Sequence, residues 1–229
     1  MTFIPPSLDC PLCPRLVQFR EENRRAYPAF FNAPVPSFGE LSAELLIVGL
    51  APGLKGANQT GRPFTGDYAG FILYPALQKT GFAKGDFLAT LHETGLARSE
   101  EGLFAGTVQQ ASGEFKLVNC RITNAVRCVP QENKPEPSEI KNCNSFLSAE
   151  MAAMSRLKVV LSLGLVSHNA VLKARGFKAS HAKFEHGAPH KLGDIILLNS
   201  YHCSRYNINT GRLSQAMFDA VVEKAKSLI

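Results

Sequence analysis

Residues 45–67 read LLIVGLAPGLKGANQTGRPFTGD, and this stretch decides the fold. Its first four residues form an aliphatic run that is typical of a buried parallel strand. The loop that follows contains five glycines and two prolines, which interrupt regular structure. A strand that runs directly into such a loop predicts an α/β sheet with a ligand site where the strand ends.

Three further apolar runs resemble this strand, at residues 121–125, 159–163 and 195–199. Helical patterns separate the runs, at residues 69–80, 138–157, 167–174 and 212–228. This alternation predicts one α/β domain over residues 1–229, with a parallel sheet of four strands covered by helices on both sides. We expect the four strand-end loops to converge on one pocket, and the polar segment Ser99–Glu114 to be a surface loop or a small hairpin.

The composition is that of a globular protein, with 45% hydrophobic and 19% charged residues among 229. No apolar run approaches the roughly 20 residues that a membrane span requires. The first residues, MTFIPP, lack the basic and apolar segments of a secretory signal, so we expect a cytoplasmic protein without disulfides. A net charge of +6 is compatible with a polyanionic partner such as nucleic acid.

Cysteines give the second strong signal. Cys10 and Cys13 form a C-x-x-C pair, and Cys128 and Cys143 lie far along the chain on a Pro-rich connection. Four thiolates can hold a tetrahedral zinc ion or an iron–sulfur cluster, and the spacing alone does not separate these, nor does it exclude a redox pair at C-x-x-C. We interpret Cys120 and Cys203 as non-ligands.

Four motifs together resemble the uracil-DNA glycosylase superfamily, specifically its iron–sulfur type-B group, also called family 5. They are GLAPG at 49–53, GRPFTGD at 61–67, TNAVRC at 123–128 and HCSRYN at 202–207. The resemblance implies a three-layer αβα sandwich around a four-stranded parallel sheet. It also implies a 4Fe-4S cluster held by four cysteines: Cys10, Cys13, Cys128 and Cys143. The N-terminal C-x-x-C helix would complete that site.

The resemblance implies an enzyme that removes uracil, and by our hypothesis other deaminated bases such as hypoxanthine, from double-stranded DNA. No lysine in the motifs stands out as a Schiff-base nucleophile, so we expect a monofunctional enzyme that removes the base without cleaving the strand. Cleavage of the N-glycosidic bond passes through a cationic sugar and an anionic base. Asp67 would stabilise the sugar and orient or deprotonate the water, although an Asp before a helix is also a common N-cap. The acidic residue of better-known members is replaced by Ala51, which makes Asp67 the nearest substitute.

The base itself would be flipped out of the stack and held by side chains from three of the motifs. Phe64 offers a ring for stacking, and the amide of Asn124 matches the edge of uracil, beside Gly49 and Ala51. His202 would donate a hydrogen bond toward the O2 atom of the leaving base, as either a neutral or a charged imidazole. An isolated Phe or a strand-end Asn also has an ordinary structural interpretation.

DNA contacts are expected from polar and aromatic residues in the same loops. These residues are Lys55, Arg62, Arg127, Ser204, Arg205, Tyr206 and Asn207. The protein would act as a monomer.

Three other interpretations remain open at this point. One is the sister type-A group, family 4, which usually has an acidic residue where this chain has Leu50 and a Pro where it has Cys203. Another is an iron–sulfur DNA-binding redox protein without catalysis. The third is a hydrolase that holds a nucleotide phosphate, although the loop lacks the G-x-x-x-x-G-K-[ST] pattern. His181, His186 and His190 are interpreted as surface residues rather than a metal cluster.

Overall fold

The computed structural model describes residues 3–87 and 115–229. The predicted loop Ser99–Glu114 lies outside the described residues. A helix long and apolar enough to cross a membrane is not found in the described ranges.

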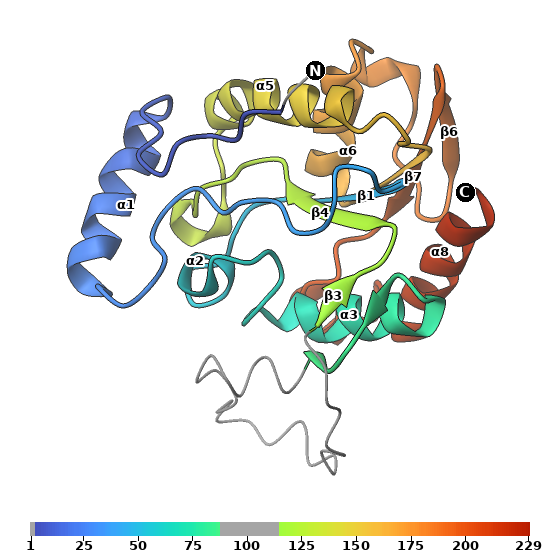
Figure 1. Cartoon of the computed structure of the whole chain (residues 1–229), viewed down its shortest axis with the longest axis horizontal. Helices are drawn as coiled ribbons and strands as arrows, with labels where there is room; N and C mark the ends of the chain where they lie inside the picture. The colour runs from blue at the N-terminus through green and yellow to red at the C-terminus, as the bar shows by residue number, and fades with distance from the viewer. Residues whose placement is uncertain (1–2, 88–114) are drawn as a thin grey trace.

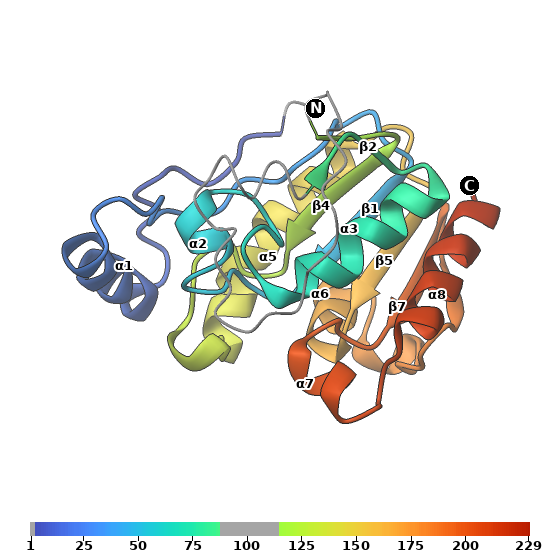
Figure 2. The same ribbon diagram turned by 90° about the horizontal axis from the view of Figure 1, so that it is seen from below.

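A five-stranded sheet in the order β4-β1-β5-β7-β6 forms the centre of the molecule. Four of its strands are parallel, as predicted, and Figure 2 shows them side by side. The fifth, β6, pairs antiparallel with β7 and was missed, because its sequence PHKL has no apolar run. The strands are β1 (Leu45–Gly49), β4 (Cys120–Asn124), β5 (Val159–Leu163), β6 (Pro189–Leu192) and β7 (Ile195–Ser200).

Helices cover both faces of the sheet, with α5 and α6 on one side and α3 and α8 on the other (Figure 1). The αβα layering predicted from the sequence is therefore confirmed. The longer helices are α1 (Pro14–Ala26), α3 (Tyr68–Thr80), α5 (Pro137–Ala153), α6 (Leu165–Ala174) and α8 (Gln215–Ser227). Shorter elements are α2 (Ala57–Thr60), α7 (Arg205–Asn209), the 3-10 turns η1 (Gln131–Asn133) and η2 (Ala179–His181), and a small hairpin of β2 (Ala83–Lys84) and β3 (Lys116–Leu117).

Strand β1 shows why two layers are required. Leu45 and Ile47 pack in the cluster that contains α3 and α8, whereas Leu46 and Val48 pack in the cluster that contains α5 and α6. Successive side chains of a strand point to opposite faces, so an apolar run without alternation must be covered twice.

The outer edge of β4 is closed by the segment that precedes β1. Phe38 forms an antiparallel bridge with Ile122, with hydrogen bonds in both directions. Gly39 follows in the left-handed region, and a Cβ there would lie 2.3 Å from the carbonyl oxygen of Cys120. Only glycine allows the chain to approach the strand this closely.

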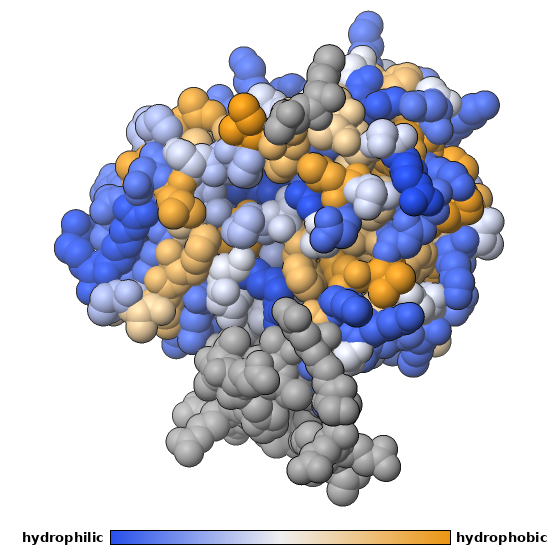
Figure 3. Space-filling model, in the orientation of Figure 1, coloured by the Kyte–Doolittle hydropathy of each residue, from blue (hydrophilic) through white to orange (hydrophobic). Residues whose placement is uncertain are grey.

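Helix α1 lies at the end of the molecule, away from the sheet (Figure 1), and its outer surface is largely hydrophilic (Figure 3). It is attached through Leu16, which packs against Val126 and Cys143. The C-x-x-C segment leads directly into it, with Cys13 at the N-cap position and Pro14 as the first helical residue. Pro is favoured there because its missing N–H would have no helical partner.

A buried ion-pair network joins β4 to α5. Glu150 on α5 has no exposed surface and accepts hydrogen bonds from Arg121 of β4 at 2.7 Å and from Arg127 just beyond it at 2.5 Å. Arg127 also donates to Ser37 Oγ at 2.7 Å. Coulombic attraction by the two guanidinium groups, opposing the effect of burial, holds the pKa of Glu150 below its ordinary value.

We predict that Glu150→Ala strongly destabilises the fold, because it leaves two buried guanidinium groups without their carboxylate. Breaking such a pair costs about 3–5 kcal/mol, which for a chain of this size lowers the thermal midpoint by about 10 °C. Thermal unfolding followed by circular dichroism measures this shift. Asp219→Ala, which breaks the surface pair with Lys79, is the matched control and should cost no more than about 1 kcal/mol. Equal shifts in the two variants would contradict this assignment.

Candidate active site and cysteine cluster

A cavity of about 810 Å³ opens at the carboxyl ends of the parallel strands. The loops after β1, β4 and β7 line it. Gly164, which follows β5, does not line it but lies next to His202, since a Cβ added at Gly164 would be 3.5 Å from the Cβ of His202. The predicted convergence is therefore confirmed for three of the four strand-end loops. Asp67, Asn124, Phe64, Ala51 and His202 all line this cavity.

Gly49 and Asn124 are register partners at the ends of β1 and β4. A Cβ at position 49 would lie 2.3 Å from the Asn124 amide oxygen and 2.7 Å from the Phe64 ring. The glycine thus leaves room for both side chains to meet over the end of β1. Phe64 itself has a left-handed backbone with φ of 56°, a strained conformation for an aromatic residue.

The carboxylate of Asp67 fits into a space created by two more glycines of the same loop. A Cβ at Gly53 would lie 2.2 Å, and one at Gly56 1.9 Å, from Asp67 Oδ1. Asp67 Oδ2 accepts a hydrogen bond from the backbone N–H of Ala57 at 3.1 Å. Side chains at positions 53 and 56 would displace the carboxylate, so the glycines fix its position.

Asp67 occupies the N-cap position of α3, but its side chain makes no capping hydrogen bond to that helix. The alternative that it is merely a cap is therefore not what the structure shows. Burial raises the pKa of Asp67 to about 6, against the opposing effect of the backbone hydrogen bonds from Ala57 and Gly53. A carboxylate poised near neutral pH is suited to acid–base work.

His202 lies across the cavity, with its ring centroid 6.4 Å from that of Phe64. Burial lowers the pKa of His202 to about 4, so the imidazole is neutral at pH 7. The next residue, Cys203, points into the core, where its Sγ lies 3.7 Å from the carbonyl oxygen of Ala69. His202 lines the cavity whereas Cys203 does not, so these neighbours form no catalytic pair.

Several predicted DNA-contacting residues lie around the cavity. Lys55, Arg205 and Tyr206 are exposed and line it, and the Arg205 guanidinium lies 5.2 Å from the ring centre of Tyr68. Ser204 and Asn207 also line the cavity, but both have structural partners. Ser204 caps α7 by accepting from Asn207 N–H, and Asn207 Nδ2 donates to the carbonyl oxygen of His202 at 2.8 Å.

The prediction that Arg127 contacts DNA is wrong. Its side chain is buried and paired with Glu150, so it cannot reach a phosphate. Its position in a motif gave no sign of the buried carboxylate that it would meet. Arg62 lies outside the cavity, with its guanidinium over the rings of Phe38 and Phe115.

One wall of the cavity was not predicted from the sequence. It consists of Phe19 on α1 and the turn that contains Pro130, Glu132 and Asn133. The Pro-rich connection between Cys128 and α5 signalled a loop, but nothing in its residue types signalled that it would face the strand ends.

The four cysteines Cys10, Cys13, Cys128 and Cys143 line a second cavity between α1 and α5. Burial, with repulsion among the thiolates, raises the pKa of Cys128 to about 12 and that of Cys143 to about 11. Within residues 3–87 and 115–229, no three His, Cys, Asp or Glu side chains converge closely enough to hold a single metal ion. Cys120 is buried in the sheet core, as expected for a non-ligand.

The three histidines interpreted as surface residues differ in their exposure and in their contacts. His181 is exposed, and His186 stacks on Tyr201 and accepts a hydrogen bond from its backbone N–H at 3.2 Å. His190 is half-buried in β6. Of the three, only His181 is fully exposed, so the surface interpretation holds for that residue and not for the partly buried His186 and His190.

Comparison with known proteins identifies the family. The family model of the Uracil DNA glycosylase superfamily matches residues 36–226. A type-5 uracil-DNA glycosylase of Thermus thermophilus is 40% identical over 225 residues, covering 96% of this chain and 93% of the relative. One of Pyrobaculum aerophilum is 34% identical over 227 residues, covering 97% and 90%.

The type-4 group is more distant. A type-4 uracil-DNA glycosylase of Pyrobaculum aerophilum is 28% identical over 162 residues, covering 70% of this chain and 59% of the relative. The match to the type-5 relatives extends over nearly the whole chain, whereas the match to this type-4 relative covers 70% of it. The chain therefore belongs to the Uracil DNA glycosylase superfamily and, within it, to the type-5 group.

Proposed function

We propose that this protein is a DNA glycosylase that excises uracil, and also hypoxanthine, from double-stranded DNA. The observation that carries the proposal is the meeting of Asp67, Asn124, Phe64 and His202 in one cavity at the strand ends. Family membership supports the reaction class, since the matching relatives carry the name uracil-DNA glycosylase. Hypoxanthine is included because its N1–H and O6 present the same donor and acceptor pattern as N3–H and O4 of uracil, so the Asn124 amide suits both bases.

Asn124 and Phe64 bind the flipped base. The amide of Asn124 donates to O4 and accepts from N3–H of uracil, and the Phe64 ring supplies a stacking surface. Both side chains are largely buried, so their positions do not have to be organised when the base arrives.

His202 stabilises the departing base. A neutral imidazole donates one hydrogen bond toward O2, where negative charge develops as the glycosidic bond breaks. The low pKa of His202, which results from burial, makes this neutral donor the relevant species.

Asp67 acts on the sugar side. Its carboxylate stabilises the cationic sugar and orients the attacking water, the role left vacant by Ala51. The glycines at 53 and 56 hold it against the floor of the cavity. Lys55, Arg205 and Tyr206 on the rim would grip the phosphates and fill the space left by the flipped nucleotide.

We also propose that Cys10, Cys13, Cys128 and Cys143 hold a 4Fe-4S cluster. The residues that line this cavity fit a negatively charged group that is bound by four separate thiolates. Two arginines line the same cavity, and in both the buried Nε atom has no hydrogen-bond partner. These are Arg20, which is 4% exposed, and Arg127, whose backbone N–H also donates to Cys143 Sγ at 3.4 Å.

The arrangement favours a cluster over a single zinc ion. Zinc holds each sulfur at about 2.3 Å, so its four ligands must crowd around one point. A cluster binds each thiolate through a different iron and spreads the sulfurs apart, which agrees with the lack of a single-ion geometry in the described ranges. When bound, the cluster would tie α1 to α5 and the loop after β4.

The proposed activity is tested with labelled duplexes that contain uracil, hypoxanthine or thymine, followed by alkaline cleavage at abasic sites. We expect release of uracil and hypoxanthine without strand cleavage before alkali, and no release of thymine from a T·A pair. Equal resistance of hypoxanthine and adenine would contradict the wider base range. Tight DNA binding without any base release would instead favour a non-catalytic redox protein.

We predict that Asp67→Asn lowers the excision rate by about 100-fold or more, because a neutral amide neither stabilises the sugar cation nor accepts a proton. In the wild type, the rate should rise with pH through about 6 and then level off, as the Asp67 carboxyl ionises. His202 adds no change between pH 5 and 8, since its pKa is about 4. Single-turnover kinetics across this range measure both effects. The matched control is Asp219→Asn on α8, outside the site, and a full rate in Asp67→Asn would remove its proposed role.

We predict that Cys13→Ser purifies with little iron, because one of four cluster ligands is lost. Iron and sulfide analysis together with the visible absorption spectrum measures this loss. Cys120→Ser, at a buried cysteine outside the cavity, should retain the full iron content. Stoichiometric zinc in the wild type, in place of iron and sulfide, would overturn the assignment.

A further inference from the structure

The wall formed by Phe19 and the turn after β4 is not explained by the base-binding residues. Phe19 belongs to α1, which precedes the region that the superfamily model matches. The turn is also far in sequence from the loops that hold Asp67 and His202. Nevertheless, Phe19, Pro130, Glu132 and Asn133 line the same cavity.

The turn has an unusual backbone. Glu132 and Asn133 are consecutive non-glycine residues in the left-handed region, with φ of 52° and 55°. Each such residue is strained, and a pair persists only where surrounding contacts hold it. Both side chains are exposed, so packing of these side chains does not supply the restraint.

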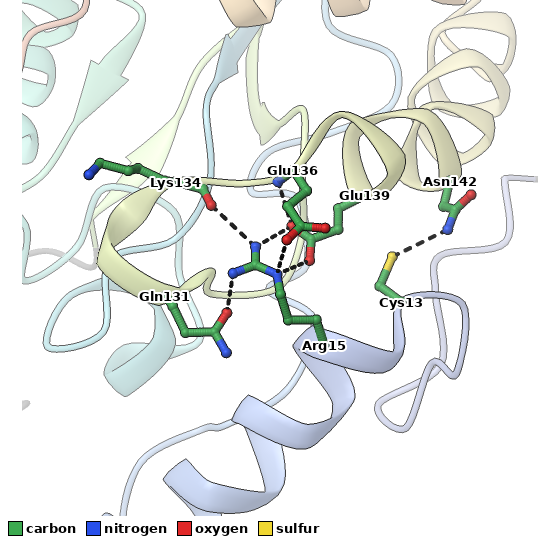
Figure 4. Close-up of polar contacts among 7 residues, drawn as sticks. All are labelled: Cys13, Arg15, Gln131, Lys134, Glu136, Glu139 and Asn142. Carbon is green, nitrogen blue, oxygen red and sulfur yellow. Dashed lines mark hydrogen bonds and ion pairs between the residues drawn. The ribbon is translucent and has the colours of Figure 1, made fainter.

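Arg15 of α1 supplies contacts on both sides of the strained pair (Figure 4). One terminal nitrogen donates to the side-chain oxygen of Gln131, the residue before the pair. The other donates to the backbone carbonyl of Lys134, the residue after it, at 3.2 Å. The guanidinium therefore spans the turn from end to end.

Arg15 is itself held firmly by α5. Its Nε and Nη2 form a two-pronged pair with the carboxylate oxygens of Glu139, both at 2.7 Å. Glu139 is buried and also accepts from the backbone N–H of Glu136 at 2.7 Å, which closes the capping box of α5. Glu136 contributes a second ion pair to Arg15 at 3.3 Å. Such planar, two-pronged pairing is specific to arginine.

We propose that Phe19 and the turn Pro130–Asn133 form a second wall that binds a DNA base beside the excised nucleotide, with Arg15 as the residue that positions this wall. The inference rests on the proposed function. Phe19 offers an aromatic surface on which any base can stack. The Asn133 amide and the Glu132 carboxylate offer hydrogen-bonding groups for a base edge.

The charges distinguish this wall from the rest of the rim. Lys55 and Arg205 are cationic and suit phosphates. Phe19, Pro130 and Asn133 are uncharged, and the Glu132 carboxylate is paired with Lys134 at 3.1 Å on the exposed surface, so this wall offers a phosphate no free cation. The wall is therefore suited to bases rather than to the DNA backbone.

The test compares Arg15→Gln, Phe19→Ala and Arg24→Gln in steady-state excision from a uracil-containing duplex. Arg24 is the matched control, because it lies on the same helix with similar side-chain exposure, 35% against 30%, and its ion pairs go to Asp9 and Glu21 instead. We expect KM to rise about tenfold in Arg15→Gln and Phe19→Ala, with kcat within about twofold of wild type. Arg24→Gln should match the wild type, and iron content should be unchanged in all three variants.

A fall in kcat with KM unchanged, or the same loss in Arg24→Gln, would overturn the proposal. If Arg15→Gln loses iron or fails to fold, Phe19→Ala alone decides, and an unchanged KM there refutes the second wall. The proposed function is judged separately, by uracil release from the wild type. If the wild type releases no base, fluorescence anisotropy with the same duplex still tests the wall, and unweakened binding by Phe19→Ala would refute it.

Discussion

The carboxylate of Glu150, buried between Arg121 and Arg127, is the interaction on which the rest of the structure depends. It fixes β4 and the residues just beyond that strand to α5. Asn124 of the candidate site lies between the two arginines in sequence, and Cys128 of the cysteine cavity follows directly after the second. One buried charge network therefore holds the base-binding side of the cavity and one thiol of the cysteine cluster at the same time.

Close approach of the backbone is the second constraint. Side chains are absent at Gly49, Gly53 and Gly56, and the space that they leave is taken by Asn124, Phe64 and Asp67. The loop that follows β1 thus contributes to the site mainly through positions that carry no side chain. This explains why Asp67 can serve the cavity although it belongs to the start of α3, and why its helix is left without a side-chain cap.

Much of this organisation could be predicted from the sequence, because the four parallel strands are continuous apolar runs and their ends carry glycine or polar residues. The antiparallel strand β6 could not, since PHKL has no apolar period and forms a strand only by pairing with β7. Arg127 was misjudged for a related reason. Its partner Glu150 is 23 residues away on a helix, and a pairing at that separation leaves no local pattern. The wall of Phe19 and Glu132 likewise depends on tertiary contacts, among them those of Arg15 with Gln131 and Lys134.

Both edges of the central sheet carry features that oppose further strand pairing in the described part of the chain, which has a consequence for behaviour at high local concentration. On one side, Phe38 occupies hydrogen-bonding positions along β4. On the other, β6 presents Pro189 and Lys191, a residue without a backbone donor and a charged residue. Open strand edges act as templates for pairing between copies of a protein, which leads to aggregation. The central sheet is therefore protected against edge-to-edge pairing when copies of the protein gather along a polyanion.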